Sequence, residues 1–245
     1  MALIWHEKNL IDKKVWDKGL VTLTYDWKLD FIPGQFVTAL YPDESPQFRR
    51  LYTIASAPNQ YLEIYAVEID NGHLSPRLVD MKIGDKLLFT NKIKGLFTLA
   101  HVPPKENLWL ISTGTGLAPY ISMLREAGIW NRYKRVILIH GARSKSRLSY
   151  DIELKQISES KPLTYLTYVT RESKDKMPRG RLTTLLENGQ LEKDAQCEIT
   201  PSDSHVLLCG NADMITEMTV LFSKLKGLSI HKRRSPGEMT IEKYW

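Results

Sequence analysis

The stretch LWLISTGTGLAP, from Leu108 to Pro119, decides the fold of the second half of the chain. Its first six residues are an apolar run typical of a buried strand, and a Gly-Thr-Gly turn then leads into a helical pattern. Glycines let a backbone approach a pyrophosphate, and the free N–H groups of a helix start face the anion. Pro119 replaces the last glycine of the six-residue dinucleotide fingerprint. A tight strand-to-helix turn without a ligand is therefore the alternative interpretation.

Downstream of this stretch, apolar strand patterns alternate with helical patterns. The strand patterns cover residues 108–113, 135–142, 163–170 and 204–210, and the helical patterns cover 117–127, 149–160 and 212–226. Arg181 opens a further helical segment. Such alternation is typical of parallel strands joined by helices. We predict a doubly wound parallel α/β sheet over residues 101–245, with a C-terminal aromatic tail.

Upstream, the chain reads as short strands rich in β-branched and aromatic residues. They cover residues 21–27, 35–41, 49–56, 61–69 and 85–91, with one helical pattern at 75–81. Turn signals such as Pro33-Gly34 and Asn71-Gly72 separate them. Strands this close together indicate an antiparallel β-barrel over residues 1–100. The fold class we predict is thus two-domain, β plus α/β, with the boundary near residues 101–105.

Composition excludes several classes of protein. The 245 residues include only two cysteines, Cys197 and Cys209. A disulfide framework, a four-cysteine zinc site and a thiolate-held iron–sulfur cluster all need more. We therefore expect no metal, and any redox chemistry would use an organic cofactor. The N-terminus lacks a signal-like apolar run, and no stretch approaches the ~20 apolar residues of a membrane span, so we expect a cytoplasmic protein.

Arginines stand where the predicted parallel strands end. Arg143, with Ser144 beside it, follows one strand, Arg171 follows the next, and Arg181 opens a helical segment. A sheet that binds NAD commonly has an acid at the first of these positions. Three arginines at neighbouring strand ends would instead surround a ribose 2′-phosphate and favour NADPH over NADH. The alternative is that they are solvated loop residues, and the net charge of +6 fits either interpretation.

Several motifs occur in an order that resembles a known family. A strand carries Arg50-Leu51-Tyr52-Thr53, and YLEIYAVEIDNGHLSPRL (61–78), GTGLAP (114–119), LLCGN (207–211) and a terminal EKYW follow it. Together they resemble the ferredoxin–NADP⁺ reductase family, and more narrowly its bacterial ferredoxin/flavodoxin–NADP⁺ reductases. The resemblance covers nearly the whole chain. It implies an FAD-binding antiparallel barrel followed by an NADP-binding α/β domain.

The resemblance implies a role in FAD binding for residues of both halves. Arg50 would hold the diphosphate and Tyr52 would stack on the isoalloxazine. The Thr53 hydroxyl would lie near flavin N5, where serine is usual in the family and the added methyl would crowd the hydride path. One terminal aromatic would cover the opposite flavin face. The FAD set is Arg50, Tyr52, Thr53, Tyr65, Ala66, Val67, His73, Leu74, Ser75, Tyr244 and Trp245.

The family's NADP site and catalytic residues carry over in the same way. The implied NADP set is Thr113, Gly114, Thr115, Gly116, Arg143, Ser144, Arg171, Arg181, Cys209, Gly210 and Asn211. The implied catalytic set is Thr53, Cys209, Glu242 and Tyr244. We expect Cys209 to pack and align the nicotinamide rather than form a covalent bond, because no His/Asp partner motif accompanies it. A plain buried cysteine is the alternative.

The implied reaction is hydride transfer between NADP(H) and FAD, with single electrons exchanged between FAD and a ferredoxin or flavodoxin. The basic run from His231 to Arg234 would help dock that acidic carrier, although such runs are also typical of solvated surfaces. An NADPH-dependent flavin reductase and the reductase component of an oxygenase stay open. The non-enzymatic alternative is a basic barrel that binds single-stranded nucleic acid. We expect no nucleic-acid or membrane partner, since nucleotide cofactors explain the arginines and aromatics better.

Overall fold

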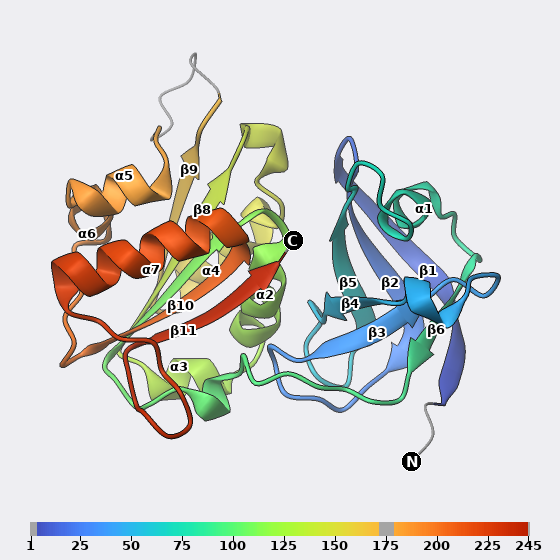
Figure 1. Cartoon of the computed structure of the whole chain (residues 1–245), viewed down its shortest axis with the longest axis horizontal. Helices are drawn as coiled ribbons and strands as arrows, with labels where there is room; N and C mark the ends of the chain where they lie inside the picture. Colours follow the sequence, from blue (N-terminus) through green and yellow to red (C-terminus); the bar gives the residue numbers. More distant parts are fainter. Residues whose placement is uncertain (1–3, 172–178, 245) are drawn as a thin grey trace. The chain divides into compact units, whose positions relative to one another are not determined.

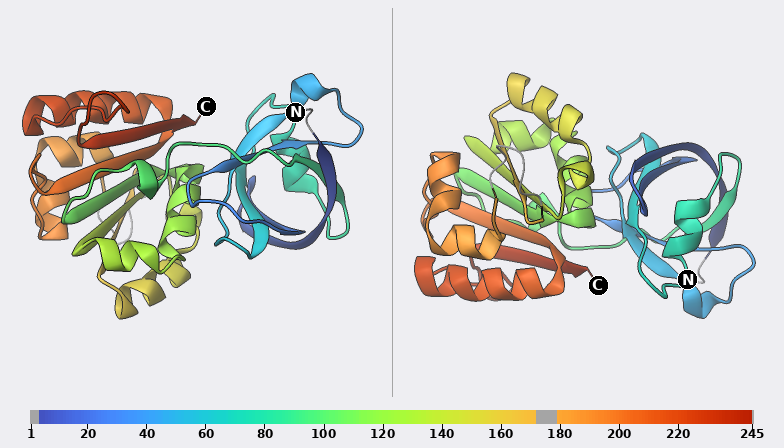
Figure 2. Two further views of the ribbon diagram at one scale, coloured as in Figure 1. Left: turned by 90° about the horizontal axis from the view of Figure 1, so that it is seen from below. Right: turned by 90° about the horizontal axis from the view of Figure 1, so that it is seen from above.

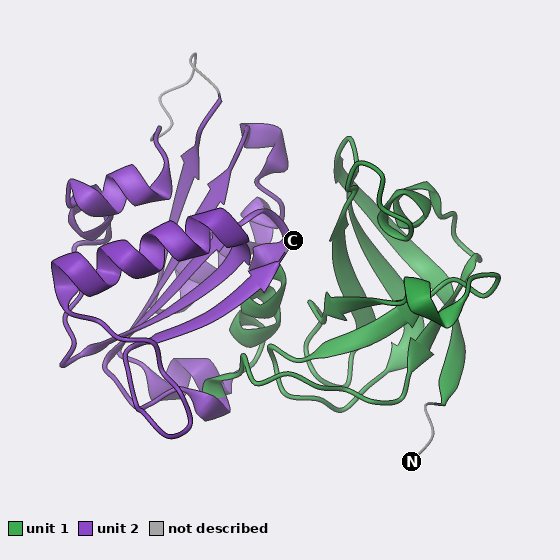
Figure 3. Ribbon diagram, in the orientation of Figure 1, with its two compact units in different colours: residues 1–99, 118–126 green, residues 100–117, 127–245 purple. Residues whose placement is uncertain are grey.

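The computed structural model describes residues 4–171 and 179–244, which form two compact units (Figures 1 and 3). One unit contains the chain up to Leu99 together with Ala118–Glu126, and the other contains Ala100–Leu117 and the chain from Ala127 onward. The domain limits 1–100 and 101–245 stay predictions. No sequence pattern indicated that Ala118–Glu126 groups with the first unit.

The first unit is a six-stranded antiparallel barrel, as predicted (Figure 2). Its strands lie in the order β4-β3-β6-β1-β2-β5, and a bridge between Ile54 and Ile64 joins the two outermost strands. The strands are β1 (Trp5–Asp17), β2 (Leu20–Lys28), β3 (Phe36–Leu40), β4 (Arg50–Thr53), β5 (Tyr61–Val67) and β6 (Lys86–Thr90). All but β1 were predicted.

Period-two alternation builds the barrel core. Side chains two residues apart on each strand point to the same face, so every second residue of a strand lines the interior. The short helix α1 (Ser75–Asp80) adds Leu78 to this core. The strand residues that pack together in this core are Leu10, Val21, Leu23, Tyr25, Val37, Ala39, Leu62, Ile64, Ala66, Leu87 and Phe89. Burying a large apolar side chain contributes about 1.5–3 kcal/mol, so this set stabilises the unit.

The second unit contains a five-stranded parallel sheet in the order β11-β10-β7-β8-β9. Its strands are β7 (Asn107–Thr113), β8 (Arg135–Ala142), β9 (Leu163–Val169), β10 (Ser204–Asn211) and β11 (Met239–Tyr244). The first four were predicted and β11 was not. After β9 the chain returns to the other side of β7 and forms β10 and β11, so the strand order reverses between β7 and β10. In a doubly wound sheet, such a switch point is where ligands bind, beyond the carboxyl ends of the strands.

Helices cover both faces of this sheet (Figure 2). One face packs against α5 (Leu182–Glu187), α6 (Gln190–Ala195) and α7 (Ala212–Lys226), with Trp109, Ile139 and Phe222 fully buried between them. On the other face lie α3 (Gly128–Arg132) and α4 (Asp151–Ser160). The helix α2 (Ala118–Leu124) groups with the barrel. A parallel sheet with helices on both faces is a doubly wound α/β sheet. The predicted fold class, a β domain followed by an α/β domain, is therefore confirmed.

Candidate functional site

The glycine turn lies at the switch point between β7 and β10. Gly114–Leu117 forms a short 3₁₀ turn after β7, and Gly114 has a φ of 55°, which favours glycine. A Cβ on Gly116 would overlap the Cys209 carbonyl oxygen and lie 2.5 Å from the Cys209 carbonyl carbon. The Asn211 amide donates a hydrogen bond of 3.1 Å to Thr113 Oγ1. The turn is therefore packed directly on the end of β10, which leaves no room for a side chain at position 116.

The structure brings the predicted arginines together at the carboxyl ends of β8 and β9. The amide of Arg171 donates to the carbonyl oxygen of Arg143 at 2.9 Å. The Gly180 amide donates a hydrogen bond of 3.3 Å to the carbonyl oxygen of Val169, the last residue of β9. Arg181, the next residue, therefore also lies at the end of β9. Arg181 is the N-cap residue of α5, as the predicted helix start requires. All three arginine side chains are exposed.

Beside the turn, β10 and β11 hold a second group of predicted residues. Cys209 lies opposite Glu242 in the parallel register, and Asn211 lies opposite Tyr244. Cys209 is fully buried, and burial raises the pKa of its thiol well above the ordinary value, with Glu242 adding to the effect. The Tyr244 side chain lowers the pKa of this thiol, but by less than burial raises it. Because a protonated buried thiol is a poor nucleophile, this environment suits packing and alignment.

Asn211 ends β10 and caps the following helix. Its side-chain oxygen accepts hydrogen bonds of 3.1 Å from the amides of Asp213 and Met214, the first donors of α7. Gly210 precedes it with a φ of 134°, and a Cβ there would lie 2.5 Å from the Thr113 carbonyl oxygen. The Cys-Gly-Asn sequence therefore fits β10 closely against β7. Trp245, the other predicted aromatic, lies outside the described residues.

In the barrel unit, the flavin motif occupies β4. Arg50 is exposed, and its Nη1 donates to the Arg49 carbonyl oxygen at 2.9 Å. Tyr52 is half-buried against the barrel core, where burial raises the pKa of its hydroxyl and the nearby Arg50 partly offsets that rise. Thr53 ends the strand and is 7% exposed. The predicted cation and aromatic are thus neighbours at the end of a barrel strand.

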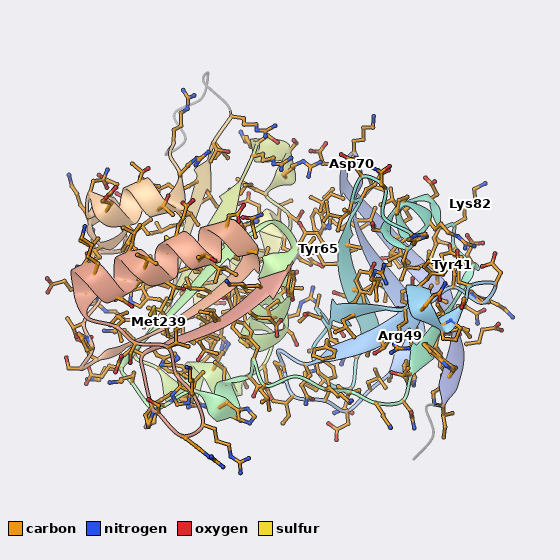
Figure 4. The ribbon with its side chains drawn as sticks, in the orientation of Figure 1. Tyr41, Arg49, Tyr65, Asp70, Lys82 and Met239 are labelled. Atoms are coloured by element: carbon orange, nitrogen blue, oxygen red, sulfur yellow. The ribbon has the colours of Figure 1, made fainter. Side chains whose placement is uncertain are left out.

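The remaining predicted flavin residues lie on β5 and in the turn that follows it (Figure 4). Tyr65 and Ala66 are buried, and Val67 ends the strand half-buried. Ser75 Oγ accepts a hydrogen bond of 3.1 Å from the Ile69 amide, which closes the turn. These contacts place the backbone of both segments firmly.

A ring contact brings the turn to the segment that leads into β4. The rings of Phe48 and His73 lie 4.2 Å apart between centroids. Leu74, next to His73, is buried. Farther along α1, the Arg77 guanidinium lies 3.7 Å from the centre of the Tyr41 ring. The two segments predicted to hold the diphosphate are therefore neighbours in the barrel.

Comparison with known proteins identifies the family. Residues 110–219 match the family model described as an oxidoreductase NAD-binding domain. The flavodoxin/ferredoxin–NADP reductase of Buchnera aphidicola from Schizaphis graminum is 36% identical, covering 98% of this chain and 99% of that protein. The flavodoxin/ferredoxin–NADP reductase of Escherichia coli K12 is 35% identical over the same shares.

The chain belongs to the flavodoxin/ferredoxin–NADP reductase family. A crystal structure of the ferredoxin NADP⁺ reductase from Neisseria gonorrhoeae, with bound FAD and NADP, matches it with a TM-score of 0.90. That protein is 26% identical, and 98% of each chain is covered. The family resemblance predicted from the sequence is confirmed.

Within this reductase fold, sequence reasoning missed residues that carry no motif. Arg125 follows α2 by one residue, and its Nη1 lies 2.6 Å from Glu63 Oε2 and 3.1 Å from the Ala55 carbonyl oxygen. No periodicity or spacing singles out such a residue, because its role depends on contacts with strands far away in the sequence.

The basic run lies at the other end of β11 from Tyr244. The His231 amide donates to the Met239 carbonyl oxygen, and Lys232 pairs with Ser235, so this loop precedes the strand. β11 is six residues long, which corresponds to about 20 Å. The structure therefore does not bring the run close to the end of the sheet that carries Cys209.

No helix among the described residues is long and apolar enough to span a membrane. Within residues 4–171 and 179–244, no group of three or more His, Cys, Asp or Glu side chains is placed to hold a metal ion.

Proposed function

We propose that this chain is an FAD-containing oxidoreductase that transfers hydride between NADP(H) and FAD and exchanges single electrons with a flavodoxin or ferredoxin. The carrying observation is that the family's motifs fall at the positions where a doubly wound sheet binds a nucleotide. The glycine turn, the Cys-Gly-Asn sequence and the arginines all lie at the carboxyl ends of the parallel strands. When bound, FAD accepts two electrons together and releases them singly.

The turn and the arginines fit an NADP molecule. Gly114 takes the positive φ of the turn and Gly116 lets the turn pack on β10, so the helix start after β7 can offer its backbone N–H groups to a pyrophosphate. Arg143, Arg171 and Arg181 hold the 2′-phosphate, with Ser144 beside them, because guanidinium groups bind phosphate through paired hydrogen bonds. The full proposed set adds Thr113, Thr115, Cys209, Gly210 and Asn211.

The barrel residues fit FAD. Arg50 supplies an exposed cation for the diphosphate, and Tyr52 offers an aromatic face beside it. Residues 65–67 and 73–75 supply backbone groups to the flavin edge and the diphosphate. Thr53 brings a hydroxyl to the reacting edge of the flavin.

Three residues of β10 and β11 act on the nicotinamide end. Cys209 packs against the ring as a protonated thiol and aligns it, while Glu242 lies opposite Cys209 in the register. Tyr244 occupies the position of the nicotinamide until the nucleotide displaces it.

The positive net charge of +6 attracts the acidic electron carrier, a flavodoxin or ferredoxin. The basic run from His231 to Arg234 acts through long-range steering, since it lies at the end of β11 opposite Tyr244. Steering of this kind is screened beyond a Debye length of about 10 Å at 0.1 M salt. We also propose that the protein works in the cytoplasm and that nucleic acid is not among its partners.

An anaerobic absorbance titration of the purified protein tests the function. We expect a yellow protein with flavin bands, which NADPH bleaches far more readily than NADH does. Reoxidation by flavodoxin or ferredoxin, compared with free FMN as the acceptor, then separates this reductase from a flavin reductase. A colourless protein that does not take up FAD on reconstitution would contradict the proposal.

Replacing Tyr244 by alanine should tighten NADP⁺ binding by about 2- to 10-fold and slow reduction of the carrier. Removing the aromatic removes a competitor for the nicotinamide position, and an aromatic pair is worth about 0.5–1.5 kcal/mol. Difference spectroscopy measures the nucleotide affinity. Tyr244→Phe keeps the ring and is the matched control, with an affinity close to that of the wild type. Unchanged NADP⁺ affinity in Tyr244→Ala would rule out this role.

A further inference from the structure

The helix α2 has an unusual place in the chain. It starts directly after the Gly114–Leu117 turn, which packs on β10, yet Ala118–Glu126 groups with the barrel (Figure 3). The backbone thus passes from the proposed pyrophosphate turn to a barrel-bound helix without any intervening loop. The first residue of α2, Ala118, is therefore bonded directly to Leu117, the last residue of that turn.

Polar contacts of two residues, Ser122 and Arg125, fix α2 to the barrel. Ser122 Oγ donates to the Ser56 carbonyl oxygen at 2.7 Å, and both residues are buried. One turn later, Arg125 Nη1 donates to the Ala55 carbonyl oxygen at 3.1 Å and pairs with Glu63 Oε2 at 2.6 Å. The side chains of Arg125 and Glu63 are only 22% and 23% exposed. Water therefore screens this ion pair less than it would a surface pair.

The partners of Arg125 belong to the flavin-motif region of the barrel. Ala55 lies two residues after Thr53, the end of β4, and Glu63 lies on the neighbouring strand β5. The Ala55 amide donates to the Glu63 carbonyl oxygen at 2.9 Å, so both partners of Arg125 are joined to each other. The Arg125 guanidinium therefore holds α2 to the strand end where the motif finishes.

We infer that Arg125 is a positioning residue for hydride transfer. Resting on the proposed function, this role follows from its place: the helix that it ties to the end of the flavin motif begins at the nucleotide turn. Hydride transfer needs the reacting atoms about 3–3.5 Å apart, and a misplacement of about 1 Å costs up to ~100-fold in rate. Arg125 acts at a distance through α2 and contacts no reacting atom.

The test compares Arg125→Met with Arg125→Lys and with the matched control Arg135→Met. Methionine keeps an apolar stem but removes both hydrogen bonds, and lysine keeps the charge with a single point of attachment. Arg135 is likewise bonded to a backbone carbonyl, that of Gln196, but at the amino end of β8. FAD content and thermal unfolding are measured first for each variant.

Stopped-flow bleaching at saturating NADPH then reports the hydride step. We expect the rate of flavin bleaching to be about 10- to 100-fold lower in Arg125→Met than in the wild type, and to be partly restored in Arg125→Lys. In Arg135→Met the rate should be unchanged. The NADPH dissociation constant should change less than threefold. Oxidation of the photoreduced flavin by ferricyanide should keep its wild-type rate, because that step does not involve the nucleotide.

Amide hydrogen exchange without nucleotide gives an independent readout. We expect amides of residues 118–126 to exchange about tenfold faster in Arg125→Met, while those of β7 and β10 are unchanged. If NADPH bleaches the wild type and bleaches Arg125→Met at the same rate, the inference is overturned but the proposed function is not. A wild type that NADPH does not bleach would overturn the proposed function. Should Arg125→Met fail to fold, Glu63→Gln must show the same rate loss in weaker form, or the inference is wrong.

Discussion

Replacing both Arg143 and Arg171 by alanine is expected to weaken NADPH binding at least ~100-fold while leaving NADH binding nearly unchanged. Each bidentate arginine–phosphate contact contributes about 1.5–3 kcal/mol, and about 1.4 kcal/mol corresponds to a tenfold change in affinity. NADH lacks the 2′-phosphate and so loses neither contact. Fluorescence quenching or flavin bleaching at varied nucleotide concentration measures both dissociation constants.

This expectation requires that both arginines bind the same phosphate group, and their backbones are adjacent. The Arg171 amide bonds to the Arg143 carbonyl oxygen at 2.9 Å, so their side chains start from neighbouring strand ends. Arg135→Ala is the control, because it removes an arginine from the opposite end of the same strand as Arg143. Equal losses for NADPH and NADH in the double variant would show that the arginines stabilise the loop rather than bind the 2′-phosphate.

The sequence predicts a helix boundary well only where a capping residue indicates it. The predicted helix 212–226 matches α7 in full, because Asn211 caps its start and Gly227 ends it with a φ of 67°. The helix predicted from residue 149 starts instead at Asp151. Tyr150 adopts a left-handed φ of 60°, which no sequence pattern indicates for a tyrosine.

The two strands that were missed lack the apolar alternation that marks the others. β1 has thirteen residues, of which only Leu10 is buried, and its order comes from backbone pairing with β2 and β6 on either side. β11 is an edge strand, and of its residues only Met239 is buried. Tyr244, at its end, is paired with Asn211 in the sheet.

At the site, the positions of motif residues were easier to predict from the sequence than those of isolated residues. The glycine turn, the arginines and the Cys-Gly-Asn sequence follow strands, and parallel strands end at one edge of a sheet, so their proximity was predictable. Arg125 was not predictable, because its partners Ala55 and Glu63 lie more than sixty residues away in the sequence. The roles assigned to the individual site residues stay predictions, and the variants above test them.

Replacing Gly116 by alanine is expected to lower the free energy of unfolding by about 3 kcal/mol or more. The added Cβ would overlap the Cys209 carbonyl oxygen and lie 2.6 Å from Gly210 Cα. These are backbone atoms of β10, a strand paired on both sides, so they cannot rotate away as a side chain would. Either the turn or the strand must move.

Gly128 provides the matched control for this substitution. It lies in α3, and a Cβ there would meet nothing within 4 Å. Gly128→Ala should raise stability by about 0.5–1 kcal/mol, since alanine is the better helix former. Urea unfolding followed by circular dichroism measures both variants, and about 3 kcal/mol corresponds to ~6–12 °C in the thermal midpoint for a chain of this size.

The Gly116 result also bears on the nucleotide site, because the same close packing sets the position of the turn. If the turn moves to accommodate the Cβ, its amides leave the place where a pyrophosphate binds, and nucleotide affinity falls together with stability. Wild-type stability in Gly116→Ala would mean that the turn separates from β10 at no cost, which would contradict a packed turn. A loss of stability with full NADPH affinity would instead show that β10 yields and the turn does not.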